Sequence, residues 1–158
     1  MTTYTENTGF NKGSAAIPAK GLTKISMIEV TLNWATIAAD RAAAGQTAIG
    51  ANDILEVMPI PAKTYVMQVG LDVTTAEGAT CTVDVGDATD PDGFLDGVNA
   101  NTAASYATSL ALAEAAPNTV VGYSNGKYYA AADTIDIKTV NAADAAVMRL
   151  WALVADCS

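Results

Sequence analysis

Histidine is absent from this sequence. Without an imidazole, the chain cannot build a Ser-His-Asp or Cys-His catalytic group or a histidine-ligated zinc site. The two cysteines, Cys81 and Cys157, are too few for a disulfide framework or a thiolate metal site, so we expect two free thiols. These absences remove much of the common catalytic chemistry, and we predict no enzymatic activity and no cofactor.

Basic residues are also few. Lys and Arg number 8 against 17 Asp and Glu, which gives a formal net charge of -9. A nucleic-acid interface needs clustered cations to neutralise phosphates, so DNA and RNA are not expected partners. The beginning of the chain lacks the features of a signal peptide, and no apolar run reaches the roughly 18 residues of a membrane span. We therefore expect a soluble protein that is made in the cytoplasm and binds no membrane.

Large apolar side chains are scarce. The sequence is 51% hydrophobic, but aromatic residues make up only 6% of it, and about one fifth of the chain is alanine. At 158 residues the chain has the length of a single domain with a core of its own. Close packing of backbones, or burial shared with neighbouring chains, would compensate for the shortage of large side chains.

Several segments alternate apolar and polar residues with the period of two that is typical of half-buried strands. These segments are residues 25–34, 65–74, 81–85 and 134–140. Residues 146–154 are instead apolar on both faces except for Arg149, which predicts a central strand or a subunit contact. Short strands at this spacing predict an all-β fold, an antiparallel β-sandwich or jelly roll. Residues 65–85 read as a β-hairpin that turns at Ala76-Glu77-Gly78.

Other elements are predicted from composition. Residues 35–45 favour a short helix that ends at Gly45, with a loop as the alternative. Residues 53–58 favour a strand that Pro59 and Pro61 end. Residues 109–116 are alanine-rich, and a helix, a strand or a loop remains open there. Residues 119–130 read as a second hairpin around Ser124-Asn125-Gly126.

The first 24 residues show neither helical nor strand periodicity, and we expect an extended N-terminal arm followed by a β-sandwich domain over residues 25–158. Lys12, Lys20 and Lys24 make this arm mildly basic, against Glu6 alone. An arm of opposite charge could dock on the acidic body of a neighbour, although a solvated tail is the simpler interpretation.

Residues 86–97 form an acidic, glycine-rich segment whose aspartates are candidate calcium ligands. The candidates are Asp87, Asp90, Asp92 and Asp96. The spacing does not fit an EF-hand, because with Gly93 at the turn position the first ligand would be Ala88 and the closing glutamate would be Asn99. Asp-Pro-Asp-Gly is also good turn chemistry, so a shaped loop is the preferred interpretation.

Two carbohydrate-related alternatives depend on few residues. A glycosidase carboxylate pair would need an aromatic-lined groove, and the acidic segment offers only Phe94. Tyr123, Tyr128 and Tyr129 could form a sugar-stacking platform, but tyrosines on strands more often serve packing.

Residues 60–103, which contain D-V-G-D and D-G-F-L-D-G, and residues 127–156, which contain A-A-D-T-I-D-I before an apolar strand, resemble small virion structural proteins of tailed bacteriophages. The resemblance implies a β-sandwich that assembles as an oligomer on the capsid surface, as a decoration or cement protein. It carries no catalytic residue to this chain.

The resemblance leads to a specific expectation. We expect a non-enzymatic protein on the outside of a phage head, a dimer or trimer that is made in the host cytoplasm and holds neighbouring major capsid proteins together. The alternative is a receptor- or carbohydrate-binding module of a tail fibre. The expected interface residues are Tyr4, Phe10, Lys12, Lys20, Lys24, Trp151 and Leu153.

Overall fold

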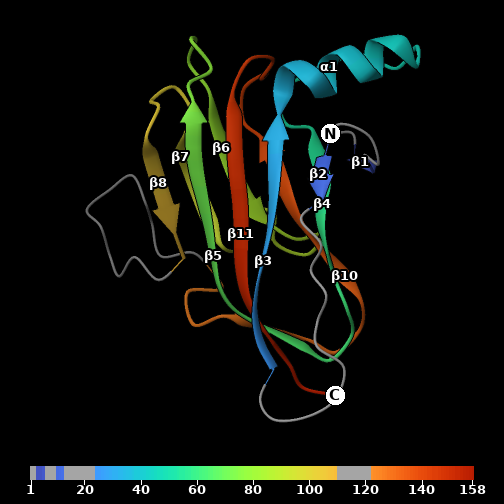
Figure 1. The fold of residues 1–158 in the computed structure, drawn as a ribbon, viewed down its shortest axis with the longest axis vertical. Helices are drawn as coiled ribbons and strands as arrows, with labels where there is room; N and C mark the ends of the chain where they lie inside the picture. The colour runs from blue at the N-terminus through green and yellow to red at the C-terminus, as the bar shows by residue number, and fades with distance from the viewer. Residues whose placement is uncertain (1–2, 6–9, 13–23, 110–121) are drawn as a thin grey trace.

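The computed structural model describes the backbone of residues 3–5, 10–12, 24–109 and 122–158. Within these residues, two β-sheets face each other, and a single helix, α1 (Trp34–Ala43), lies at one end of the sandwich (Figure 1). The predicted all-β, largely antiparallel sandwich is confirmed. In the described part of the chain, no helix has the length and apolar character needed to span a membrane.

The first sheet has five strands in the order β1-β4-β10-β6-β7. Its strands are β1 (Thr3–Thr5), β4 (Ile54–Ile60), β10 (Asp133–Thr139), β6 (Thr82–Gly86) and β7 (Leu95–Asn99). β1 runs parallel to β4, and the other pairs are antiparallel. Strand β10 therefore lies at the centre of this sheet, and the strand predicted over residues 134–140 is confirmed.

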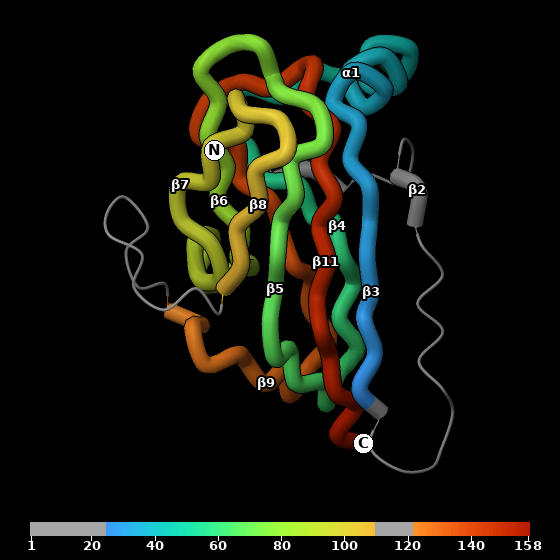
Figure 2. The backbone as a smooth tube through the Cα atoms, turned by 60° about the vertical axis from the view of Figure 1, so that its left-hand side comes forward, coloured from blue at the N-terminus to red at the C-terminus, as the bar shows by residue number. Residues whose placement is uncertain are grey.

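The second sheet has six strands in the order β2-β3-β11-β5-β8, with β9 also paired to β5. Its strands are β2 (Phe10–Lys12), β3 (Lys24–Asn33), β11 (Val147–Asp156), β5 (Thr64–Thr75), β8 (Ser105–Thr108) and β9 (Lys127–Tyr129). The long strands β3, β11 and β5 run side by side along the molecule (Figure 2). The apolar segment at the end of the sequence is thus a central strand, as predicted.

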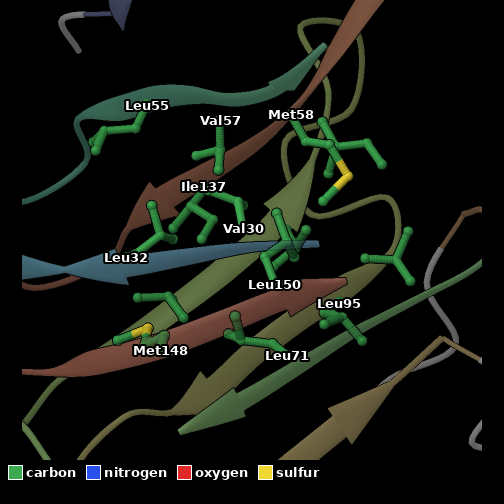
Figure 3. Close-up of a cluster of buried hydrophobic side chains, with 14 of the residues drawn as sticks. Val30, Leu32, Leu55, Val57, Met58, Leu71, Leu95, Ile137, Met148 and Leu150 are labelled. Atoms are coloured by element: carbon green, nitrogen blue, oxygen red, sulfur yellow. The ribbon is translucent and has the colours of Figure 1, made fainter. Parts of the chain in front are cut away.

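The core lies between the two sheets and is made of the alternate residues that each strand points inward. Val30, Leu71 and Leu150 from the six-stranded sheet meet Leu55 and Ile137 from the five-stranded sheet (Figure 3). All five side chains are at most 4% exposed. Cys81 joins this core as a free thiol, and its burial raises its pKa to about 11, with the charge of Glu77 adding to the shift.

The predicted hairpin of residues 65–85 is wrong. β5 and β6 belong to different sheets, so the segment between them crosses from one layer to the other. The Glu77 carboxylate in this crossing accepts the backbone N–H groups of Asp144, Ala145 and Ala146 at 2.7–3.2 Å. Burial alone would raise the pKa of Glu77, but these bonds lower it. The crossing is therefore held against the β10–β11 connection rather than folded into a two-strand turn.

The helix prediction is confirmed, with Asn33 capping its first turn and Gly45 in the left-handed conformation just beyond its end. The predicted end of the β4 segment is wrong, because the strand continues through Pro59 to Ile60. Pro59 pairs with Thr134 of β10 on one side only, while the described pairing with β1 stops at Glu56. A proline without an N–H is tolerated at such a position.

The second predicted hairpin is described in part. The turn is present, with Gly126 at φ +82° and its N–H bonded to the Tyr123 carbonyl at 2.8 Å. The strand that follows it, β9, pairs with β5. Residues 119–121 of the hairpin and most of the alanine-rich segment lie outside the described residues.

Within the predicted arm, residues 3–5 and 10–12 form the edge strands β1 and β2 of the two sheets. Lys24 begins β3 opposite Asp156 of β11. Whether the arm acts as a separate unit stays a prediction.

Candidate interaction surface

The outer face of the six-stranded sheet, here called the β11 face, carries an unusual set of side chains. Cross-strand pairing places the outward residues in rows, and one row joins Ile25, Ala155, Tyr65 and Tyr128 across four strands. The β11 face includes the apolar or aromatic residues and the charged residues of the same outward rows: Ile25, Met27, Glu29, Asp72, Tyr106, Tyr128, Arg149, Trp151 and Leu153.

The β11 face collects the exposed apolar surface of the described chain. The exposed fractions are 50% for Ile25, 60% for Met27, 76% for Tyr106 and 50% for Tyr128, and these are all the large hydrophobic side chains that the described residues leave exposed. Single exposed apolar residues are ordinary, but a concentration on one face marks an interaction site. The other sheet contributes none of the four.

Trp151 lies at the centre of the β11 face because Gly70 makes room for it. The two residues are directly paired across β11 and β5. A Cβ atom on Gly70 would lie 2.2 Å from Cζ2 of the indole, so the ring lies flat against the glycine backbone. An aromatic ring covering a strand glycine restores the packing that the glycine lacks. Trp151 therefore remains half-buried and forms the broad centre of the face.

The charged groups on the β11 face pair with one another. Arg149 donates to Asp72 from Nε at 2.9 Å and from Nη2 at 2.5 Å, and its Nη1 lies 3.6 Å from a Glu29 oxygen. The bond to Asp72 and its charge raise the pKa of Arg149. These charged groups lie beside the apolar residues of the β11 face. The face therefore offers a partner both an apolar contact and paired charged groups.

Sequence reasoning located part of this surface. Trp151 and Leu153 lie on the β11 face two residues apart, as the apolar character of β11 suggests. Tyr4 lies on β1 at the edge of the other sheet, while Phe10 and Lys12 lie on β2 and Lys24 at the start of β3. Lys20 lies outside the described residues. Their roles in an interface stay predictions.

Sequence reasoning missed Ile25, Met27 and Tyr106, and it named Tyr128 only as part of a sugar-stacking platform. For the first two a signal was present, because they fall on the opposite parity from the core residues Ile28 and Val30. A strand that is apolar on both faces has one face to cover. For the tyrosines the sequence held no such signal, since their face depends on which strands β8 and β9 join.

The acidic segment lies on the opposite sheet, whose outer face is here called the β10 face (Glu56, Asp84, Gly86, Asp136 and Lys138). After Gly86 the chain folds back in a turn of residues 87–93, here called the acidic turn. A Cβ atom on Gly86 would lie 1.9 Å from the Asp90 carbonyl oxygen, so the turn packs directly on this strand. Gly86 is needed here because backbone occupies the space of a side chain.

Asp87 anchors the acidic turn and is fully buried. Its carboxylate accepts hydrogen bonds from the backbone N–H groups of Thr89 at 2.9 Å and Asp90 at 3.1 Å and from the Tyr129 hydroxyl at 2.7 Å. It also forms an ion pair with Lys127. Burial alone would raise the pKa of Asp87, but these partners lower it. The charge is therefore compensated inside the chain.

The tyrosines near this turn do not share one exposed platform. Tyr123 packs edge-on to Phe94, with ring centroids 5.0 Å apart, and its hydroxyl accepts from Lys127 Nζ at 2.8 Å. Tyr129 is 3% exposed and bonds Asp87, whereas Tyr128 points to the β11 face. Two of the three tyrosines are thus committed to holding the acidic turn.

The four candidate calcium ligands do not come together as one group, although Asp90 and Asp92 are hydrogen-bonded to each other. Asp87 is enclosed in its ion pair, Asp92 is exposed on the turn, and Asp96 lies on β7. A hydrogen bond with Asp92 raises the pKa of Asp90, with smaller contributions from burial and from the charges of Asp92 and Asp87. Within the described residues, no three carboxylate or cysteine groups gather in a way that could hold a metal ion.

The sequence matches no protein-family model and no curated protein. Solved structures with a similar fold do exist. One is a chain from "Capsid of Ralstonia phage GP4", with a TM-score of 0.61 and 14% identity, and the match covers 99% of this chain and 99% of that one.

Two further structures show the same likeness. A chain from "Acidic stable capsid structure of Helicobacter pylori bacteriophage KHP30" matches with a TM-score of 0.55 and 13% identity over 85% of this chain and 89% of that chain. A chain from "Cyanophage Pam1 capsid asymmetric unit" matches with a TM-score of 0.50 and 20% identity over 92% and 94%. At these identities the likeness establishes a shared fold.

Proposed function

We propose that this chain is a non-enzymatic structural protein of a phage capsid, of the decoration or cement type, that binds the outside of the head. The observation that carries the proposal is the fold match to a chain of the Ralstonia phage GP4 capsid over 99% of both chains. A match of this extent leaves almost no part of either chain outside the common fold. The resemblance of residues 60–103 and 127–156 to small virion proteins supports the same role.

The β11 face supplies the contact that such a role needs. Burying one large aliphatic or aromatic side chain contributes about 1.5–3 kcal/mol. Ile25, Met27, Tyr106 and Tyr128 are at least half exposed in this chain, so half or more of that contribution is still available to a partner. Because a shell repeats each contact many times, a modest contact per copy stabilises the assembly.

The partner in this proposal is the major capsid protein, or two of its copies where they adjoin. The arm of residues 1–24 is a second contact, since Lys12, Lys20 and Lys24 are basic whereas the whole chain has a net charge of -9. An arm that reaches an adjacent acidic copy would favour a dimer or trimer. No catalytic residue is assigned, because a binding surface is sufficient for this role.

Co-sedimentation with capsids is the direct test. Shells assembled from the major capsid protein of the same virus are mixed with the chain and pelleted. We expect the wild type to pellet saturably, with a fixed ratio of copies to capsid protein. Met27→Glu and Leu153→Glu place a charge in the proposed contact and should weaken pelleting at least about tenfold, the equivalent of 1.4 kcal/mol.

Gln46→Glu is the matched control, because it adds a negative charge at an exposed residue in the loop after α1. This variant should pellet like the wild type. A wild-type chain that stays in the supernatant would contradict the proposal. So would Met27→Glu and Leu153→Glu chains that are folded by circular dichroism and pellet normally.

Removing residues 1–22 tests the arm separately. We expect a folded chain that no longer coats shells, and undiminished attachment would remove the arm from the proposal. Glycan binding that EDTA abolishes, without capsid binding, would instead support the alternative function, a receptor- or carbohydrate-binding module of a tail fibre.

A further inference from the structure

Asp136 occupies an unusual position in the five-stranded sheet. It lies in the middle of the central strand β10, between Ile135 and Ile137, which point into the core. Alternation along the strand therefore points Asp136 outward, onto the β10 face. Outward residues of a sheet usually meet solvent, yet Asp136 is only 2% exposed.

The acidic turn accounts for part of this burial. On β10's two neighbours, Asp136 is paired with Glu56 of β4 and Gly86 of β6. The backbone of Asp90 and Pro91 lies on Gly86, where an added Cβ would be 1.9 Å from one atom and 2.5 Å from another. The turn thus packs across the β10 face directly beside the Asp136 carboxyl group.

The charged groups with the largest effect on Asp136 are negative. They are Glu56 from β4, Asp87 from the acidic turn and Asp133 from its own strand. The two lysines on this side of the sheet are paired with other carboxylates, Lys127 with Asp87 and Lys138 with Asp84. Among the described residues, Asp136 Oδ1 has no hydrogen-bond partner.

An ionised carboxylate is therefore more costly at this position than a neutral carboxyl group. Burial penalises the charged form most, and nearby negative charges add to that penalty. Burial, together with the charges of Glu56, Asp133 and Asp87, raises the pKa of Asp136 to about 7, although the Thr134 side chain opposes the shift by hydrogen bonding.

We propose that Asp136 is a proton-dependent contact beneath the acidic turn: its neutral form lets the turn pack on the β10 face, and its ionisation loosens that packing. The physical reason is that hydration stabilises an ionised Asp136, and the covering turn is part of what separates it from water. This inference does not depend on the proposed capsid function. We expect the acidic turn to pack more tightly on the β10 face in mildly acidic solution and more loosely above neutral pH.

Two measurements on the full chain test the inference. Carbon-detected NMR of the side-chain carboxyl groups should show Asp136 titrating above pH 6. Amide hydrogen exchange should then show protection factors for Gly93 and Phe94 that fall at least about tenfold between pH 5.5 and pH 8.5. Both amides close the turn, Gly93 onto the Asp90 carbonyl and Phe94 onto the Val85 carbonyl.

Asp136→Asn keeps the size of the side chain and removes its charge at every pH. In this variant the protection factors of Gly93 and Phe94 should no longer change with pH. Asp40→Asn removes a carboxylate from α1 and is the matched control, in which the wild-type change should persist. Titration of Asp136 below pH 5 would overturn the inference even if the Asp136→Asn variant failed to fold. An equal fall in protection in Asp136→Asn would also overturn it.

Discussion

The two outer faces of this sandwich are built on the same alternation but are completed differently. On the β10 face, the chain covers itself, because the acidic turn folds back onto Gly86 and Asp87 finds its partners in Lys127 and Tyr129. On the β11 face, Met27 is 60% exposed and Trp151 half-buried, and the described chain provides no such cover.

This difference between the faces predicts that substitutions on one face affect the stability of the chain and substitutions on the other affect its binding to a partner. Polar groups that are buried within a chain must be satisfied there, so a change on the β10 face should reduce the free energy of unfolding. Exposed apolar groups contribute little until a partner buries them, so a change on the β11 face should reduce binding. The predictions below measure this separation, beginning with the largest expected change in stability.

Asp87→Asn should cause the largest loss. It leaves Lys127 without its buried counter-charge and weakens the bond from Tyr129, and breaking a buried pair costs about 3 kcal/mol. Denaturant unfolding monitored by circular dichroism measures the change. Asp92→Asn is the control, because Asp92 lies exposed on the same turn, and it should stay within about 0.5 kcal/mol of wild type. Equal losses of unfolding free energy in the two variants would contradict the role of Asp87 as the anchor of the acidic turn.

The same substitution at two glycines compares the faces directly. Gly86→Ala meets the backbone of Asp90 and Pro91, which cannot move aside cheaply, and should cost about 2 kcal/mol. Gly70→Ala meets only the indole of Trp151, which can rotate into solvent, and should cost less than about 1 kcal/mol while shifting tryptophan emission to the red. A larger loss at Gly70 than at Gly86 would contradict this account of the two faces.

The sequence predicted where the strands lie better than it predicted which strands pair in a sheet. Period-two alternation located β3 and β10, because it records which side chains are buried and which are not, and an apolar run on both faces located β11. These patterns could not show that β5 and β6 join different sheets, since that depends on the crossing held by Glu77 and the N–H groups of the β10–β11 connection. Those bonds join positions almost 70 residues apart.

The same limit applied to the candidate site. Trp151 and Leu153 were predictable because β11 is apolar on both of its faces. Tyr106 and Tyr128 were not, because their side of the sheet is set by pairing with β5. The sequence also read residues 86–97 as a specialised segment, while the structure shows that Asp87 is a buried anchor in it.

The pH dependence of stability gives the third prediction. Asp136 has an ordinary pKa of 3.8 and a folded-state pKa of about 7, so the folded chain holds its proton more tightly than the unfolded chain does. The contribution of protonated Asp136 to the free energy of unfolding is complete below about pH 4 and is lost as the pH rises towards 7. Over this range wild type should lose at least about 1.4 kcal/mol relative to Asp136→Asn, the equivalent of one pKa unit.

The comparison with Asp136→Asn isolates this group. Asp87 has a lowered pKa, so its contribution is present above its ordinary pKa and is lost as the pH falls, but it is common to both proteins. Denaturant unfolding at pH 4, 5, 6 and 7 therefore gives the Asp136 term as a difference. A constant difference across the range would show that Asp136 titrates alike in the folded and unfolded chains.

The smallest change in stability should come from the β11 face. Met27→Ser removes a side chain that is 60% exposed, and Ile25→Ser one that is 50% exposed, so each should change the free energy of unfolding by no more than about 0.5 kcal/mol. The loss should appear instead in capsid pelleting. Ile28→Ser is the control on the same strand, because Ile28 is 6% exposed and points into the core, and it should cost at least about 2 kcal/mol. If Met27→Ser destabilised the chain as much as Ile28→Ser, the apolar residues of the β11 face would belong to the fold rather than to a partner.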